Sequence, residues 1–326
     1  MGIRKRIQYL RRISQAYLGG GRSQLSFWHE TPEANPNAKA GEIGEYYMTF
    51  AEKADYAGPF DAEGIPKLDY RGVLGPQYNP IAIAQYGLGN FNQYLRTRDN
   101  ERRRKFLLVA DWMVNHLERN PHGLSMWMHH FNWEYRDTLV APWYSALAQG
   151  QGISLLVRAY EETGDARYKN ASDAAFAAFQ QDVAHGGVAF TDSAGDLWFE
   201  EYIVNPPTHI LNGFMWAAWG VYDYSLLTGD ESVRHLFQRA SNTLAKNLPT
   251  YDTGFWSLYE HSGTALPMMA SSFYHRLHIV QLRVMAMLSG EALFDEMADK
   301  WLAYTTSAWK SRRALAMKAI FKICYY

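Results

Sequence analysis

The sequence predicts a mainly α-helical protein, an α/α toroid or incomplete α/α barrel of helical hairpins, preceded by an irregular segment with short strands. From Pro80 onward, apolar residues recur at the i, i+3, i+4 and i+7 spacing of amphipathic helices. A glycine followed by an acid also recurs roughly every 60 residues, which is typical of a repeat of paired helices. These junctions are Gly164-Asp165, Gly229-Asp230 and Gly290-Glu291.

Each junction predicts a tight turn between two helices. Glycine accepts the left-handed conformation that ends a helix, and the acid that follows favours the start of the next one. If these turns gather at one end of the molecule, the longer connections gather at the other. These connections cover roughly Asn120–Pro142, His185–Pro207 and Leu248–Ser272, and they are rich in aromatic, acidic and histidine residues. We therefore expect the functional residues in these loops, at one mouth of the ring.

The chain divides into three predicted regions. Residues 1–78 contain a basic helix and then a turn-rich segment that wraps the main domain, since glycine and proline are frequent between residues 19 and 77. Residues 79–310 form the helical catalytic domain. Residues 311–326 form a basic tail.

The composition excludes several classes of protein. The net charge is −1 over 326 residues, which gives no general case for nucleic-acid binding. The single cysteine, Cys324, excludes a disulfide framework and a cysteine-based metal site. No run reaches the roughly 18 apolar residues that indicate a membrane span. No nucleotide-binding fingerprint is present, so we expect neither a cofactor nor a metal.

Both ends of the chain are basic. An apolar stripe in residues 1–22 predicts an amphipathic helix, which could lie on an anionic membrane surface, hold an anionic polymer or dock as a solvated helix. Arginines interrupt the apolar stretch, so it does not resemble a signal peptide. We expect a cytoplasmic protein, in peripheral contact with the inner membrane surface through its basic ends, and a homodimer.

The stretch "DLWFEEYIVNPP" is the first candidate for chemistry. Two adjacent carboxyls, Glu200 and Glu201, resist joint ionisation when they are partly buried, so one of them would keep a proton and donate a hydrogen bond. Tyr202 follows them directly, and a tyrosine can transfer protons when its environment favours the phenolate. The simpler interpretation is a solvated pair of acids in a loop.

Other polar residues lie in the same connections or in apolar helices. Tyr259 and Tyr274 are candidate acids or bases, although a chain with 22 tyrosines uses most of them for packing. The buried amides predicted at Gln149 and Asn212 need partners, and a substrate hydroxyl is one candidate. His275 and His278 share a helix face, and hydrogen bonding is favoured over metal binding because no third ligand is evident.

A glycosidase remains open on residue types alone. It needs two carboxyls that flank a sugar bond, and Glu200 or Glu201 with Asp252 or Glu260 would supply them. The aromatic content of 15% also suits contacts with sugar rings.

At these residues the chain resembles the D-glucuronyl C5-epimerase family, whose members convert glucuronate to iduronate in heparosan-type polymers. The resemblance covers most of the chain from about Gly64, with a gap in the middle, and implies an α/α barrel. The stretches that carry it are "NPIAIAQYGL", "WYSALAQGQGISLLVRAY", "EEYIVNPPTHILNGFMWAAWGVYDY", "LPTYDTG" and "YHRLHIVQL".

The resemblance implies a role for individual residues. The family's active-site tyrosines match Tyr202, Tyr259 and Tyr274, and the matching carboxylate is Glu201. It further implies a uronate polysaccharide as the binding partner. Within or beside the matching stretches, we expect substrate contacts from Glu200, Gln149, Asn212, His275, Arg276, Trp143, Tyr144 and Tyr86.

The chain departs from vertebrate-type members in two ways. It lacks their β-rich insertion after "QYGL", and Ser262 stands where they carry an arginine that could bind the uronate carboxylate. Arg276 is a candidate substitute, and the compact form suggests a microbial member. A lyase, a glycosidase and a non-catalytic glycan-binding protein remain as alternatives.

Overall fold

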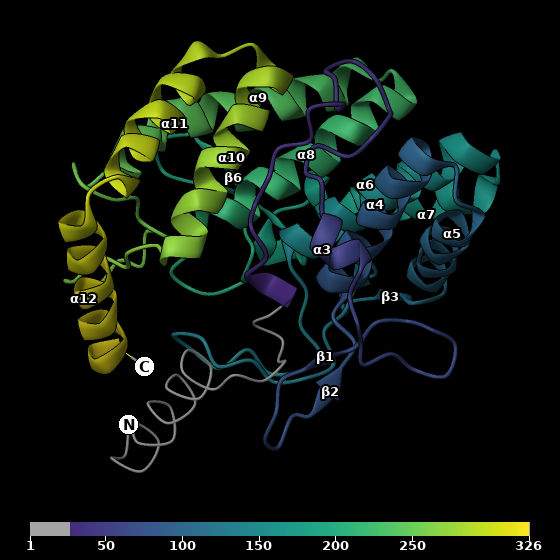
Figure 1. Ribbon diagram of the computed structural model, residues 1–326, viewed down its shortest axis with the longest axis horizontal. Coiled ribbons are helices and arrows are strands. Elements are labelled where there is room, and N and C mark those ends of the chain that lie inside the picture. The colour runs from purple at the N-terminus through teal and green to yellow at the C-terminus, as the bar shows by residue number, and fades with distance from the viewer. Residues whose placement is uncertain (1–26, 326) are drawn as a thin grey trace.

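Antiparallel pairs of helices form the body of the protein in the computed structural model, which describes residues 27–325 (Figure 1). The predicted α/α architecture is confirmed. Within the described residues the pairs are α4 (Pro80–Thr97) with α5 (Asn100–Asn115), α6 (Ala146–Thr163) with α7 (Ala166–Phe176), α8 (Leu211–Thr228) with α9 (Glu231–Asn247), and α10 (Ser272–Ser289) with α11 (Ala292–Thr305).

Several further elements lie around this ring. Helix α3 (Ala51–Ala54) precedes it and α12 (Ala308–Tyr325) follows it, while 3₁₀ turns cover Ala177–Gln180, Val183–His185 and Leu248–Tyr251. Three two-stranded antiparallel ribbons lie in the connections: β1 (Leu68–Asp69) with β2 (Pro76–Gln77), β3 (Leu117–Arg119) with β4 (Ser125–Trp127), and β5 (Ala189–Thr191) with β6 (Leu197–Phe199).

The predicted tight turns are present. Gly164, Gly229 and Gly290 adopt left-handed φ angles of 70°, 64° and 75°. The acid that follows each glycine caps the next helix through its side chain. A fourth turn of the same kind joins α4 to α5, with Arg98 in the left-handed conformation and Asp99 as the cap.

Helices α6 and α8 pack most closely at the centre of the ring. Gly150 and Gly220 let the two backbones touch, since a Cβ at Gly220 would lie 2.3 Å from the Gly150 carbonyl oxygen. Further along, the fully buried Arg158 of α6 donates to Asp223 of α8 at 2.7 Å. The Tyr47 hydroxyl also donates to Asp223, so this buried ion pair holds the wrapping segment as well.

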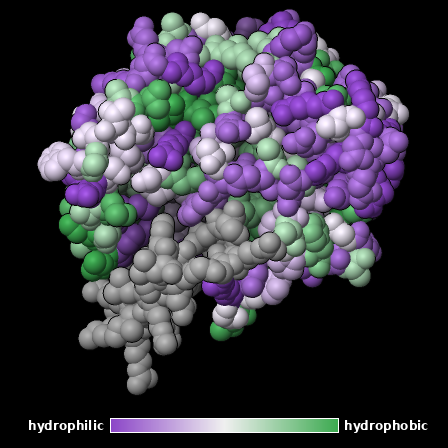
Figure 2. Space-filling model, in the orientation of Figure 1, coloured by the Kyte–Doolittle hydropathy of each residue, from purple (hydrophilic) through white to green (hydrophobic). Residues whose placement is uncertain are grey.

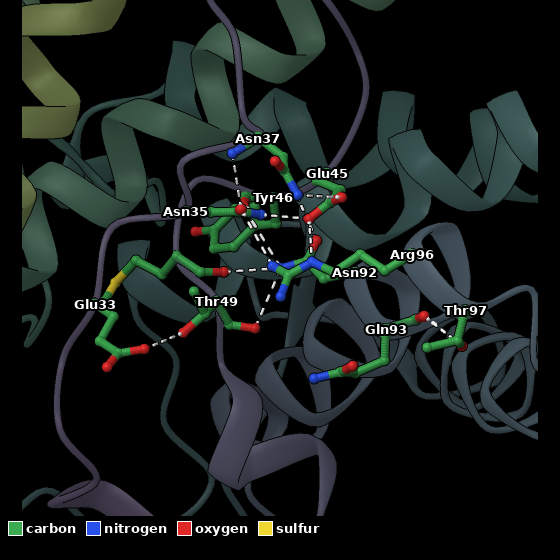
Figure 3. Close-up of polar contacts among 11 residues, drawn as sticks. Glu33, Asn35, Asn37, Glu45, Tyr46, Thr49, Asn92, Gln93, Arg96 and Thr97 are labelled. Carbon is green, nitrogen blue, oxygen red and sulfur yellow. Dashed lines mark hydrogen bonds and ion pairs between the residues drawn. The ribbon is translucent and has the colours of Figure 1, made fainter.

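The segment before α3 runs across the ring and is fastened to α4 (Figure 3). Asn92 accepts from the Tyr46 amide at 2.6 Å and donates to the Met48 carbonyl at 2.9 Å. One turn later, Arg96 pairs with Glu45 at 2.9 Å. Side chains of α4 thus supply hydrogen-bond partners for backbone groups that have none within this irregular segment.

The structure tests the prediction for only one of the two basic ends of the chain. The predicted N-terminal helix lies outside the described residues. The predicted C-terminal tail forms most of α12, where Leu315, Ile320 and Ile323 are exposed and an apolar patch appears at the left of Figure 2. Between residues 27 and 325, no helix is long and apolar enough to cross a membrane.

The anchoring of the wrapping segment can be tested with Asn92→Ala. The substitution leaves buried backbone groups of Tyr46 and Met48 without partners, so we expect a loss of roughly 2–4 kcal/mol in the free energy of unfolding. Chemical denaturation measures it. The neighbouring Gln93 points away from these contacts in Figure 3, so Gln93→Ala should change stability by only about 0.5 kcal/mol. Equal losses in both variants would contradict the anchoring role.

Candidate active site

The three long connections meet at one end of the ring, as the turn pattern predicts. The Tyr135 hydroxyl, from the connection before α6, donates to the Glu260 carboxylate and lies within hydrogen-bond distance of Thr208 Oγ1, at 3.0 Å. The His261 amide donates to the Thr208 carbonyl at 2.8 Å. Tyr135, Thr208 and Glu260 therefore join three loops that lie far apart in the sequence.

A cavity of about 300 Å³ opens beside this junction. Its walls come from the wrapping segment, the three connections and helices α4, α6, α8, α10 and α12. The four residues predicted to be catalytic all line it: Glu201, Tyr202, Tyr259 and Tyr274. Their convergence is an observed property of the fold.

The three tyrosines form two groups. The Tyr202 ring packs edge-on against Tyr135 and Trp143, with centroid distances of 4.7 and 5.7 Å. The Tyr259 and Tyr274 rings contact each other at 4.8 Å with an interplanar angle of 66°. Local structure holds this second group, because Ser271 caps α10 by accepting from the Tyr274 amide at 3.2 Å.

Tyr259 is held as a neutral phenol. Burial raises its pKa well above the usual 10, and the nearby Glu201 carboxyl raises it further. Only 7% of the residue is exposed. At neutral pH this hydroxyl can therefore donate a proton or a hydrogen bond.

The side chain of Glu201, from the loop before α8, is buried against the first turn of that helix. Gly213 makes room for it, since a Cβ there would lie 2.1 Å from Glu201 Oε2. Burial raises the pKa of Glu201 to about 8, while hydrogen bonds from Tyr202 and Asn212 oppose that shift. The carboxyl is accordingly mostly protonated at neutral pH, in agreement with the expectation that one acid of the pair keeps its proton.

Two of the predicted substrate-contacting residues, Asn212 and Trp143, line the cavity. Asn212 donates to Glu201 at 3.4 Å, and its buried Oδ1 has no hydrogen-bond partner among the described residues. An acceptor that is buried without a partner suits a ligand hydroxyl. Trp143 stacks on His129 at 3.8 Å, which fixes its indole beside Tyr202.

Two polar residues predicted to contact substrate are instead used within the protein. Glu200 pairs with the His209 ring and does not line the cavity. Gln149 bonds the Trp127 amide at 2.9 Å and two backbone carbonyls, which occupies its whole amide. A sequence pattern shows that such amides need partners but does not show which partners they find.

The remaining predicted contacts also lie outside the cavity lining. His275 shares the Ser257 hydroxyl with His278, and its other ring nitrogen bonds the Trp301 carbonyl at 3.0 Å. Arg276 is exposed on α10. Tyr86 packs against Phe60 at 5.8 Å, and Tyr144 is half-buried behind the wall.

The sequence interpretation missed the charged residues of the cavity wall. Glu30 and Lys53 from the wrapping segment, Glu134 from the first connection, and Lys318 and Lys322 from α12 all line it. Lys53 is 4% exposed, lies 3.9 Å from Glu30 and donates to the Phe27 carbonyl. Within residues 27–325, no group of three acidic, histidine or cysteine side chains is placed to hold a metal ion.

Comparison with known proteins gives a family match over more than half of the chain. The model of the family described as "D-glucuronyl C5-epimerase C-terminus" matches residues 119–303. A D-glucuronyl C5-epimerase of Caenorhabditis elegans is 31% identical over 239 residues, which cover 69% of this chain. The aligned part spans only 38% of the nematode protein.

Two further proteins are similar over most of the chain. An uncharacterized protein of Methanocaldococcus jannaschii is 25% identical over 265 residues, covering 74% of this chain and 84% of its own. The structure of cellobiose 2-epimerase from Spirochaeta thermophila superposes with a TM-score of 0.52 at 13% identity, covering 92% of this chain and 85% of its own. At that identity the second likeness concerns the fold alone.

The protonation of Glu201 predicts a pH-dependent difference in stability. Because folding raises this pKa from 4.5 to about 8, the wild type loses stability as pH rises between those values. Glu201→Gln keeps the shape without the charge. We expect its free energy of unfolding to exceed that of the wild type increasingly from pH 5 to pH 8, by roughly 4 kcal/mol at most.

Chemical denaturation at several pH values measures this difference. The matched control is Glu296→Gln, which changes an exposed glutamate of α11 and should leave the pH dependence unaltered. A stability difference for Glu201→Gln that stays constant with pH would contradict the raised pKa.

Proposed function

The chain belongs to the family described as the D-glucuronyl C5-epimerase C-terminus, and on that premise we propose that it is a polysaccharide uronate C5-epimerase. It would act on D-glucuronate residues of a polymer and convert them to L-iduronate. The observation that carries the proposal is the convergence of three tyrosines and a buried, mostly protonated glutamate in one cavity.

The reaction needs two proton transfers and no redox step. The C5–H bond of glucuronate is broken by a base on one face, and its electron pair moves into the adjacent carboxylate to give an enediolate-like intermediate. A new C5–H bond then forms with a proton from the opposite face. The ring carbon keeps its oxidation state, so the balance requires only a base, an acid and a group that stabilises the intermediate.

The two tyrosine groups suit the two faces of the sugar ring. We assign Tyr202 to one face and the pair Tyr259–Tyr274 to the other. Tyr259, held as a phenol, would deliver a proton on one face, and Tyr202 is the proposed proton acceptor on the other face. The packing of Tyr202 on Tyr135 and Trp143, and of Tyr259 on Tyr274, supports the fixed geometry that proton transfer to carbon demands.

Glu201 would donate a hydrogen bond to the substrate carboxylate. A proton on Glu201 lets it approach an anion without repulsion, and the bond strengthens as charge develops on the intermediate. The Oδ1 of Asn212 would accept from a sugar hydroxyl. These roles match the residue types that the family resemblance implies.

The glycosidase alternative has less support. Of the four carboxyls considered for it, only Glu201 lines the cavity. Asp252 is instead bound to Lys300 at 2.6 Å, and Glu260 accepts from Tyr135 behind the wall. These four acids therefore do not form a pair across the cavity. Glu30 and Glu134 also line it, so the assay for new reducing ends distinguishes hydrolysis from proton exchange.

The proposal predicts that removing one tyrosine hydroxyl slows turnover strongly while the fold survives. With heparosan as substrate, ¹H NMR should report iduronate signals for the wild type. Tyr202→Phe and Tyr259→Phe should lower the rate by roughly 10²–10⁴-fold, because each removes a proton-transfer group.

Tyr160→Phe is the control, since Tyr160 lies on α6 outside the cavity lining and should keep the wild-type rate. The same samples are assayed for ultraviolet absorbance and for new reducing ends. Rising absorbance would contradict epimerisation in favour of a lyase, and new reducing ends would contradict it in favour of hydrolysis.

A further inference from the structure

Two lysines of α12 line the cavity next to the tyrosine pair. Lys318 and Lys322 are four residues apart and therefore share one face of this helix. The Lys318 ammonium lies 5.5 Å from the centroid of the Tyr259 ring and 5.9 Å from that of Tyr274. It is held in place by a 3.2 Å hydrogen bond to the Met269 carbonyl.

The surroundings of Lys318 do not neutralise its charge. Burial lowers the pKa of Lys318 to about 8, so the side chain remains mostly protonated at neutral pH. The nearest acid acting on it is Glu260, whose own pKa is raised by burial and whose carboxylate accepts from Tyr135. Glu201, on the cavity wall, is mostly protonated. The cavity wall beside Tyr259 therefore carries the Lys318 ammonium at neutral pH.

Other basic side chains near the tyrosines are committed elsewhere. Arg276 is exposed and does not line the cavity. Arg136 donates to the carbonyl oxygens of Pro206 and Ser262. Ser262, in turn, bonds the Thr264 hydroxyl at 2.7 Å. Among the described residues of the lining, Lys318 lies against the rings of Tyr259 and Tyr274, and Lys322 lies one turn further along α12.

We propose that Lys318, with Lys322 one turn further along α12, binds the carboxylate of the uronate residue whose C5 proton is exchanged. This inference rests on the proposed function for the identity of the ligand. The ammonium would orient the carboxylate beside Tyr259 and stabilise the negative charge that builds up on it when the C5–H bond breaks. Helix α12 thereby adds carboxylate-binding lysines to the tyrosines and the glutamate that the loops of the ring supply.

The proposal predicts that the selectivity of binding depends on Lys318. A glucuronate-containing heparosan oligosaccharide and its carboxyl-reduced, neutral counterpart are compared by calorimetry. The wild type should bind the uronate form about 10- to 100-fold more tightly, as expected for a charge-assisted hydrogen bond. Lys318→Met should abolish this preference, and Lys318→Arg should retain part of it because the charge remains.

Lys310→Met is the matched control. Lys310 lies on α12 but contacts the Tyr304 ring at 4.2 Å outside the cavity lining, so the preference should stay at the wild-type value. Circular dichroism and thermal unfolding establish that each variant is folded. If Lys318→Met unfolds the protein, Lys322→Met and Lys318→Arg are measured in its place. Each should reduce the preference for the uronate oligosaccharide over the neutral one.

The outcomes separate this proposal from the proposed function. A folded Lys318→Met variant that keeps the uronate preference and the iduronate-forming activity of the wild type would overturn the role of Lys318 while the epimerase stands. A lysine-dependent preference without any C5 exchange would support the carboxylate site and overturn the epimerase. A wild type that does not distinguish the two oligosaccharides would overturn the carboxylate site.

Discussion

The hydrogen bonds of Tyr135 are the interaction on which the candidate site depends. Its hydroxyl bonds Thr208 and Glu260, and it thereby ties together three loops that enter the mouth of the ring from different hairpins. Its ring supports Tyr202. Without this junction each of the three loops would have to become ordered separately. The conformational entropy lost in ordering them would then oppose the fixed geometry of the site.

Burial of charge is the second constraint, and it acts in opposite directions on acids and bases. It raises the pKa of Glu201 and lowers that of Lys318, although only the shift of Glu201 leaves the group uncharged at neutral pH. A protonated acid and an ammonium on the same cavity wall suit an anionic sugar. The energetic cost of burying them is then offset when the ligand carboxylate arrives.

Much of the fold could be predicted because most of its tight turns depend on particular neighbouring residues, a glycine followed by an acid. The glycine-acid junction at Gly164 is visible in the sequence, whereas the corresponding turn at Arg98 is not, since arginine rarely takes the left-handed conformation. The tyrosines were found through the loops and the family resemblance. Lys318 was missed because its helix follows the ring, and only tertiary packing brings it to the cavity. Gln149 was assigned to the substrate because a sequence does not show that a buried amide finds its partners in the backbone.

The most direct test of the account is solvent exchange at C5. The protein is incubated with heparosan in deuterated water, and NMR measures deuterium at C5 of both uronates. The account predicts deuterium in iduronate and in re-formed glucuronate, without unsaturated or new reducing ends, because two faces of the ring exchange protons with tyrosines. The absence of C5 deuterium across a panel of glucuronate-containing polymers would contradict it.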